Sequence, residues 1–136
     1  MNDLIQLTFD KIIQNQSYTI VTLVGEKKRF AIYAEANLAS LLQMYLTNKK
    51  KQRPLTHELI SHIFTGFDIR IKHITIVDIQ DAIYFAKLFL EQHQDGRKTV
   101  VEIDARPSDC LVLALIHNIP VYCNRHVLET AAPIED

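Results

Sequence analysis

The chain has few residues that interrupt or cross-link a fold: three glycines, four prolines and two cysteines among 136 residues. So little glycine and proline leaves almost no room for linkers or disorder, and we expect a single domain over residues 1–136. No apolar run is long enough to cross a bilayer, which predicts a protein with no membrane partner. The N-terminus also lacks the basic start and apolar core of a signal peptide.

The two cysteines, Cys110 and Cys123, are spaced neither as zinc ligands nor as a redox pair. Both lie in apolar segments, so we interpret them as buried free thiols, which are typical of a reducing compartment. Together with the missing signal peptide, this predicts a cytoplasmic protein.

The formal net charge is only −1, which counts against a protein whose whole surface attracts nucleic acid. The basic residues are nevertheless clustered. We interpret residues 27–29 as a solvated turn. The run of Lys49, Lys50 and Lys51 with the nearby Arg53 leads into a proline-started helix and is the better candidate for contacts with phosphates.

Apolar periodicity predicts an alternation of strands and helices. Strands are expected over residues 4–13, 17–23, 29–33, 69–77, 82–91, 98–105 and 120–123. Helices are expected over residues 36–47, 54–65, 107–117 and 124–131, the second beginning at Pro54 and the last capped by Asn124. The alternation slips near Lys72 and His73, which indicates a bulge. This order favours an α+β domain with a mostly antiparallel, partly mixed sheet and about four helices.

The third of these helices is apolar on every side, so we expect it to be the central buried helix. The strand before it carries the most informative polar pattern of the chain. Alternation puts Glu102, Asp104 and Arg106 on one side, about 6.6 Å apart along the strand. Asp109 follows in the first helical turn, where backbone N–H groups and the helix dipole favour negative charge.

Two interpretations of this acidic cluster stay open. The carboxylates of Glu102, Asp104 and Asp109 are the ligand type that Mg²⁺ and Mn²⁺ prefer, and Arg106 suits a bidentate contact with a phosphate. Alternatively, Asp109 only caps its helix and Arg106 only pairs with Asp104 or Glu102, because structural ion-pair networks also gather charges.

Three segments resemble the bifunctional nuclease family: residues 104–131 with the Asp-Ala-Arg-Pro-Ser-Asp motif, residues 53–59 with Arg-Pro-Leu-Thr-His-Glu-Leu, and residues 81–88. The resemblance implies an α+β fold, homodimers and endonucleolytic cleavage of both DNA and RNA. The chain departs from the family pattern at Leu38, where a glutamate is usual, and at Ala82, where a turn glycine is usual.

Phosphodiester cleavage needs an activated water and a stabilised transition-state charge. On the nuclease hypothesis, Glu102, Asp104 and Asp109 bind Mg²⁺ or Mn²⁺, and His57 moves a proton, as histidine side chains commonly do near neutral pH. Arg53, Arg106 and the lysines at 49–51 then hold phosphates. The alternative for His57 is a residue that only caps or packs.

A second function hypothesis is a non-catalytic binding or regulatory module that keeps the family fold, motivated by the near-neutral charge and by Leu38. Among the aromatic residues, we expect Tyr84 in the core. Phe85 and Phe89 share the opposite face with Ile83 and are candidates for a subunit interface.

Overall fold

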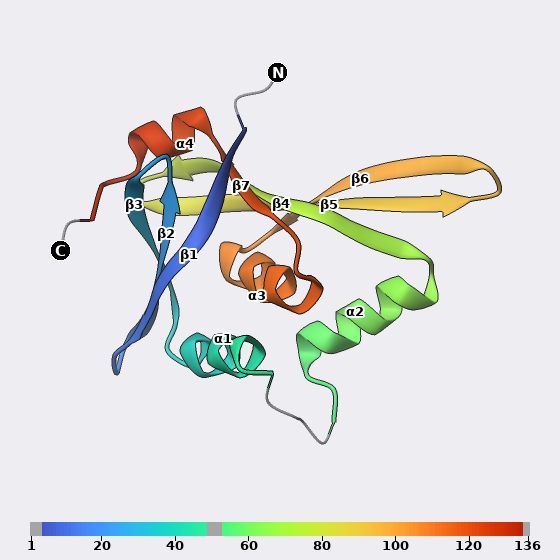
Figure 1. Cartoon of the computed structure of the whole chain (residues 1–136), viewed down its shortest axis with the longest axis horizontal. Helices are drawn as coiled ribbons and strands as arrows, with labels where there is room; N and C mark the ends of the chain where they lie inside the picture. The colour runs from blue at the N-terminus through green and yellow to red at the C-terminus, as the bar shows by residue number, and fades with distance from the viewer. Residues whose placement is uncertain (1–3, 49–52, 135–136) are drawn as a thin grey trace.

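The structure is a computed structural model that describes residues 4–48 and 53–134 (Figure 1). Its strands form one seven-stranded sheet in the order β3-β2-β1-β7-β4-β5-β6. They are β1 (Leu4–Gln14), β2 (Tyr18–Gly25), β3 (Lys28–Glu35), β4 (Ile69–Gln80), β5 (Ile83–Gln94), β6 (Arg97–Ala105) and β7 (Val121–Asn124). All neighbours are antiparallel except β4 and β7, which run parallel, so the predicted α+β fold with a mixed sheet is confirmed.

The four helices are α1 (Leu38–Leu46), α2 (Thr56–Gly66), α3 (Pro107–His117) and α4 (Arg125–Thr130). Pro107 opens α3 as predicted, and Asn118 ends it in the left-handed conformation with a φ of 53°. The start of α2 was predicted wrongly. Leu55 is still extended, and its N–H donates to the Glu58 carboxylate at 2.8 Å, so the helix begins at Thr56 and not at Pro54.

The predicted cap of α4 is also wrong. Asn124 precedes this helix, but its side-chain amide makes no capping hydrogen bond and donates instead to the carbonyl of Val77 at 2.9 Å. The amide therefore links β7 to its parallel neighbour β4. The predicted bulge in β4 is confirmed, because its pairing with β5 shifts between Ile71 and His73.

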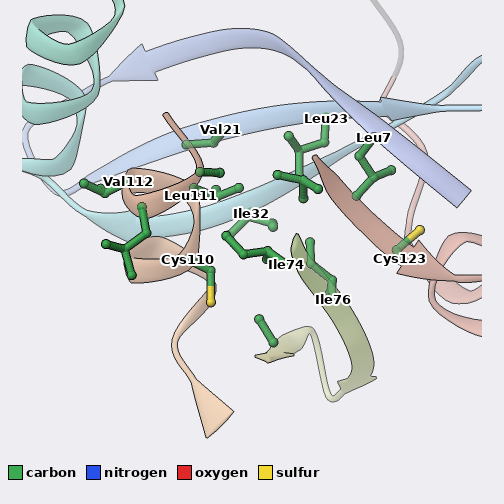
Figure 2. Close-up of a cluster of buried hydrophobic side chains, with 14 of the residues drawn as sticks. Leu7, Val21, Leu23, Ile32, Ile74, Ile76, Cys110, Leu111, Val112 and Cys123 are labelled. Carbon is green, nitrogen blue, oxygen red and sulfur yellow. The ribbon is translucent and has the colours of Figure 1, made fainter. Parts of the chain in front are cut away.

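Helix α3 lies at the centre of the molecule, and its residues from Cys110 to Ala114 are all buried, as predicted. Figure 2 shows how they pack among apolar side chains from the sheet. The labelled members of this cluster are Leu7, Val21, Leu23, Ile32, Ile74, Ile76, Cys110, Leu111, Val112 and Cys123. Both cysteines are free and buried. This core fixes the position of α3, and therefore also that of its first turn, which contains Asp109.

The sheet curls so that its two ends approach each other. The ring of Phe30 on β3 stacks on Tyr84 of β5 with centroids 5.6 Å apart, although β3 and β5 lie far apart in the strand order. A groove is left between β3 and the β6–α3 junction. The β5–β6 hairpin projects beyond the rest of the sheet (Figure 1). In the described part of the chain, no helix is both long and apolar enough to span a membrane.

Candidate functional site

Four ionisable side chains meet where β3, α2 and the β6–α3 junction come together. The Arg106 guanidinium binds Asp109 with two hydrogen bonds, from Nε to Oδ2 at 2.9 Å and from Nη2 to Oδ1 at 3.1 Å. Its Nη1 donates to Oε1 of Glu35 at 2.8 Å. Nε2 of His57 lies 2.9 Å from Oδ1 of Asp109. We call Glu35, His57, Arg106 and Asp109 the Arg106 network.

The charges of this network are stabilised by one another. Burial on its own raises the pKa of Asp109, but the hydrogen bonds from Arg106 and His57 outweigh it and hold the pKa below its usual value. The hydrogen bonds to Asp109 and Glu35 raise the pKa of Arg106. Asp109 is therefore a carboxylate and Arg106 a cation at neutral pH. The bidentate geometry also fixes the orientation of the carboxylate toward His57.

The members of the network differ in the solvent exposure of their side chains. The side chains of Arg106 and Glu35 are 64% and 63% exposed, whereas that of His57 is only 14% exposed. The Arg106–Glu35 ion pair is thus a surface pair that contributes little stability. An incoming anion can replace Glu35 at the guanidinium at low cost, while the contact between His57 and Asp109 stays in place.

Two hollows meet at Arg106. The smaller, of about 120 Å³, is lined by all four network residues together with Asn37, Leu38, Leu41 and Ser108. The larger is the groove between the two ends of the sheet, with a volume of about 550 Å³. Its lining includes Tyr33, Phe85, Asp104 and Arg106. Leu38, one of the departures from the family pattern, therefore faces the hollow that holds His57 and Asp109.

The structure does not bring the three predicted metal ligands together. Glu102 lies beside Lys87 of β5, with its Oε1 3.4 Å from Nζ, and Asp109 is held by Arg106 and His57. The reason is strand alternation. The buried Ala86 and Leu88 oppose Ala105 and Ile103, so Glu102 and Asp104 face away from the core on which α3 packs.

Within residues 4–48 and 53–134, no three His, Cys, Asp or Glu side chains are placed to hold a metal ion together. The three-carboxylate set of Glu102, Asp104 and Asp109 thus does not fit a Mg²⁺ or Mn²⁺ site as it is arranged. The hydrogen bonds of the Asp109 carboxylate go to the side chains of Arg106 and His57 and not to backbone N–H groups of α3. Arg106 in turn binds Asp109 and Glu35 rather than Asp104 or Glu102.

The predicted phosphate-binding residues are placed only in part. Arg106 belongs to the network, and Arg53 is exposed just before α2. Lys49, Lys50 and Lys51 lie outside the described residues. Sequence reasoning missed Glu35 as a site residue. Its one local signal is its position at the end of β3, three residues before α1 begins at Leu38.

The model of the bifunctional nuclease domain family matches residues 20–135. The chain belongs to this family. All members of the Arg106 network lie inside the matched segment, as do Leu38 and Ala82. The bifunctional nuclease domain therefore contains the complete hollow around His57.

Curated relatives fall into two groups. An uncharacterized protein of Mycobacterium tuberculosis is 26% identical over 118 residues, which are 87% of this chain and 68% of the relative. Bifunctional nucleases 2 and 1 of Arabidopsis thaliana are 28% and 29% identical over 89 residues. Those 89 residues are 64% of this chain and 26% of each plant protein, so the plant nucleases extend far beyond the shared domain.

Proposed function

We propose that the chain is a nuclease that hydrolyses phosphodiester bonds of DNA and RNA at the Arg106 network, with little sequence preference. One observation carries this proposal: the histidine–carboxylate contact of His57 and Asp109 lies directly beside an exposed guanidinium. A general base held by a carboxylate, next to a fixed positive charge, meets the two requirements of phosphodiester hydrolysis.

In this proposal, Nε2–H of His57 donates to Asp109, which leaves Nδ1 to accept a proton from the attacking water. The resulting hydroxide oxygen bonds to phosphorus as the bond to the leaving oxygen breaks, and that oxygen takes up the proton from His57. Asp109 is a positioning residue that holds the imidazole in one tautomer. Arg106 exchanges Glu35 for a phosphate oxygen and neutralises its charge.

In this proposal Arg53 binds a further phosphate of the backbone, and the same role is proposed for Lys49, Lys50 and Lys51, which lie outside the described residues. The test below also examines the predicted requirement for Mg²⁺ or Mn²⁺, although no step described above depends on a metal.

The predicted homodimer belongs to the same proposal. Exposed apolar side chains available for its interface include Leu59 and Ile63 on α2, and light scattering would give twice the chain mass of 15.7 kDa. The two free, buried cysteines support the proposed cytoplasmic location.

The test is cleavage of end-labelled single-stranded DNA and RNA by the purified chain, in EDTA and in separate Mg²⁺ and Mn²⁺ arms. We expect both substrates to be cut. Cutting that persists in EDTA supports catalysis by His57 without a metal. Cutting that EDTA abolishes and either cation restores supports the predicted metal requirement, and Asp104→Asn then tests its ligand set.

Absence of cleavage in every arm would contradict the proposal and favour a non-catalytic binding or regulatory module. Two observations favour that second candidate. Leu38 places an apolar side chain in the hollow where the family usually has a carboxylate, and Glu35 occupies the guanidinium of Arg106. A module of this kind would still bind single strands, which a direct binding measurement separates from cutting.

A further inference from the structure

The larger groove, next to the Arg106 network, has walls suited to a flat aromatic ligand. Tyr33 of β3 is 62% exposed although it is an aromatic residue, and Phe85 and Ile83 at the start of β5 are exposed on the facing side. The ring of Tyr33 is held by an edge-to-face contact with Tyr18, with centroids 5.1 Å apart. Exposed, oriented aromatic side chains are the usual stacking partners of unpaired bases.

The same groove contains a carboxylate with no protein partner. Asp104 is exposed, and no other described residue forms a hydrogen bond or ion pair with it. Lys87 stands opposite Asp104 on β5, but its Nζ lies beside Glu102 instead. A carboxylate accepts hydrogen bonds and donates none. The groove therefore offers a stacking wall and an acceptor, with the Arg106 cation at its edge.

From this arrangement we propose that the groove binds one unpaired nucleobase with an exocyclic amino group (adenine, cytosine or guanine) of the strand whose phosphate lies at Arg106. This deepens and rests on the proposed nuclease function. Adenine, cytosine and guanine each carry an exocyclic amino donor, whereas the one N–H donor of thymine lies between two carbonyl oxygens. Asp104 accepts from the amino group and is repelled by the two oxygens of thymine.

The charges of the groove also favour a single strand. Glu35 and Asp104 repel phosphates, so the backbone follows the rim at Arg106 and only the neutral base enters. A base in a duplex is paired and stacked, and reaching the groove would require flipping it out. The volume of about 550 Å³ lies within the range of small-molecule sites and exceeds what one base needs.

The test is fluorescence anisotropy with labelled oligo(dA), oligo(dC) and oligo(dT), all with phosphorothioate linkages to slow cleavage and all in EDTA. We expect the chain to bind oligo(dA) and oligo(dC) about tenfold more tightly than oligo(dT), as one hydrogen bond to a charged group implies. Asp104→Asn should remove this preference, because an amide both donates and accepts. Tyr33→Ala should weaken binding of all three strands, whereas Tyr33→Phe should not.

Two matched variants control for surface changes outside the groove: Phe67→Ala removes another exposed aromatic ring, and Glu129→Gln neutralises another exposed carboxylate. Neither should change the ratio of affinities. Equal affinities for the three strands, or a preference that survives Asp104→Asn, would overturn the inference even if the chain cuts nucleic acid. A preference without any cutting would instead uphold this base site and remove the proposed hydrolysis.

Discussion

Helices α2 and α3 meet at two histidine contacts that look alike and behave differently. At one, Nε2 of His57 on α2 contacts the Asp109 carboxylate on α3 at 2.9 Å. At the other, Ser61 on α2 meets Nε2 of His117 on α3 at 2.7 Å. The Ser61 hydroxyl donates to the carbonyl of His57 at 3.0 Å, so its oxygen accepts from His117.

The surroundings of the two contacts decide what each can do. Ser61 is only 7% exposed, and burial lowers the pKa of His117, so this histidine is neutral and serves packing. His57 instead faces a charged carboxylate in a hollow shared with Arg106. Both contacts join the same two helices, so the helices do not distinguish the histidines. His57 is the candidate catalytic residue because charged groups and an open hollow lie beside it.

The largest expected difference between the two contacts is in cleavage. Asp109→Asn keeps the shape of the residue but removes the charge that orients His57, so we expect the cleavage rate to fall about 100-fold or more. Ser61→Ala should leave the rate unchanged. Steady-state cleavage of one labelled single strand by both variants measures this.

Ser61→Ala has its effect on stability instead. It leaves the buried Nε2–H of His117 without an acceptor, which costs about 1–3 kcal/mol in the free energy of unfolding. Urea denaturation provides the control. A Ser61→Ala variant that loses cleavage while remaining folded would contradict this distinction, because the Ser61–His117 contact would then contribute to catalysis.

A smaller effect is expected in the pH dependence of stability. The folded-state pKa of His117 is lowered, so its contribution is full above the unfolded value of about 6.5 and is lost as pH falls below it. The pKa of Asp109 is also lowered, so its contribution is full above about 4 and is lost as pH falls further.

Urea unfolding from pH 7 to pH 3 separates these two contributions. Relative to wild type, His117→Asn should reduce the loss that begins near pH 6.5, to which His73 also contributes, and Asp109→Asn should reduce the loss that begins near pH 4, to which other carboxylates also contribute. If both variants changed the same part of the profile, the two contacts would not be independent.

Much of the fold could be predicted because its signals are local. Pro107 and Asn118 bound α3, and the change of parity between Ile71 and Ile74 reveals the bulge in β4. The capping role given to Asn124 failed because its amide reaches across the sheet to Val77, a contact that depends on the parallel pairing of β4 and β7. Such a pairing has no short-range sequence signal.

The sequence proposes single residues of the candidate site but not their arrangement. It makes both His57 and Asp109 candidates, yet nothing in either segment indicates that α2 and α3 place them 2.9 Å apart. Glu102 shares a strand with Asp104, but Lys87, which stands opposite Asp104 in the β5–β6 register, extends diagonally to Glu102. Glu35 was missed because its link to Arg106 joins residues 71 positions apart.

The most direct test of the central claim compares His57→Asn with His117→Asn in one cleavage assay, with folding of both variants checked by circular dichroism. Because we place the proton transfer on His57 alone, we expect His57→Asn to lose at least about 100-fold in rate and His117→Asn to cut like wild type. Equal rates for the two folded variants would contradict the claim that the Arg106 network is where phosphodiester bonds are cut.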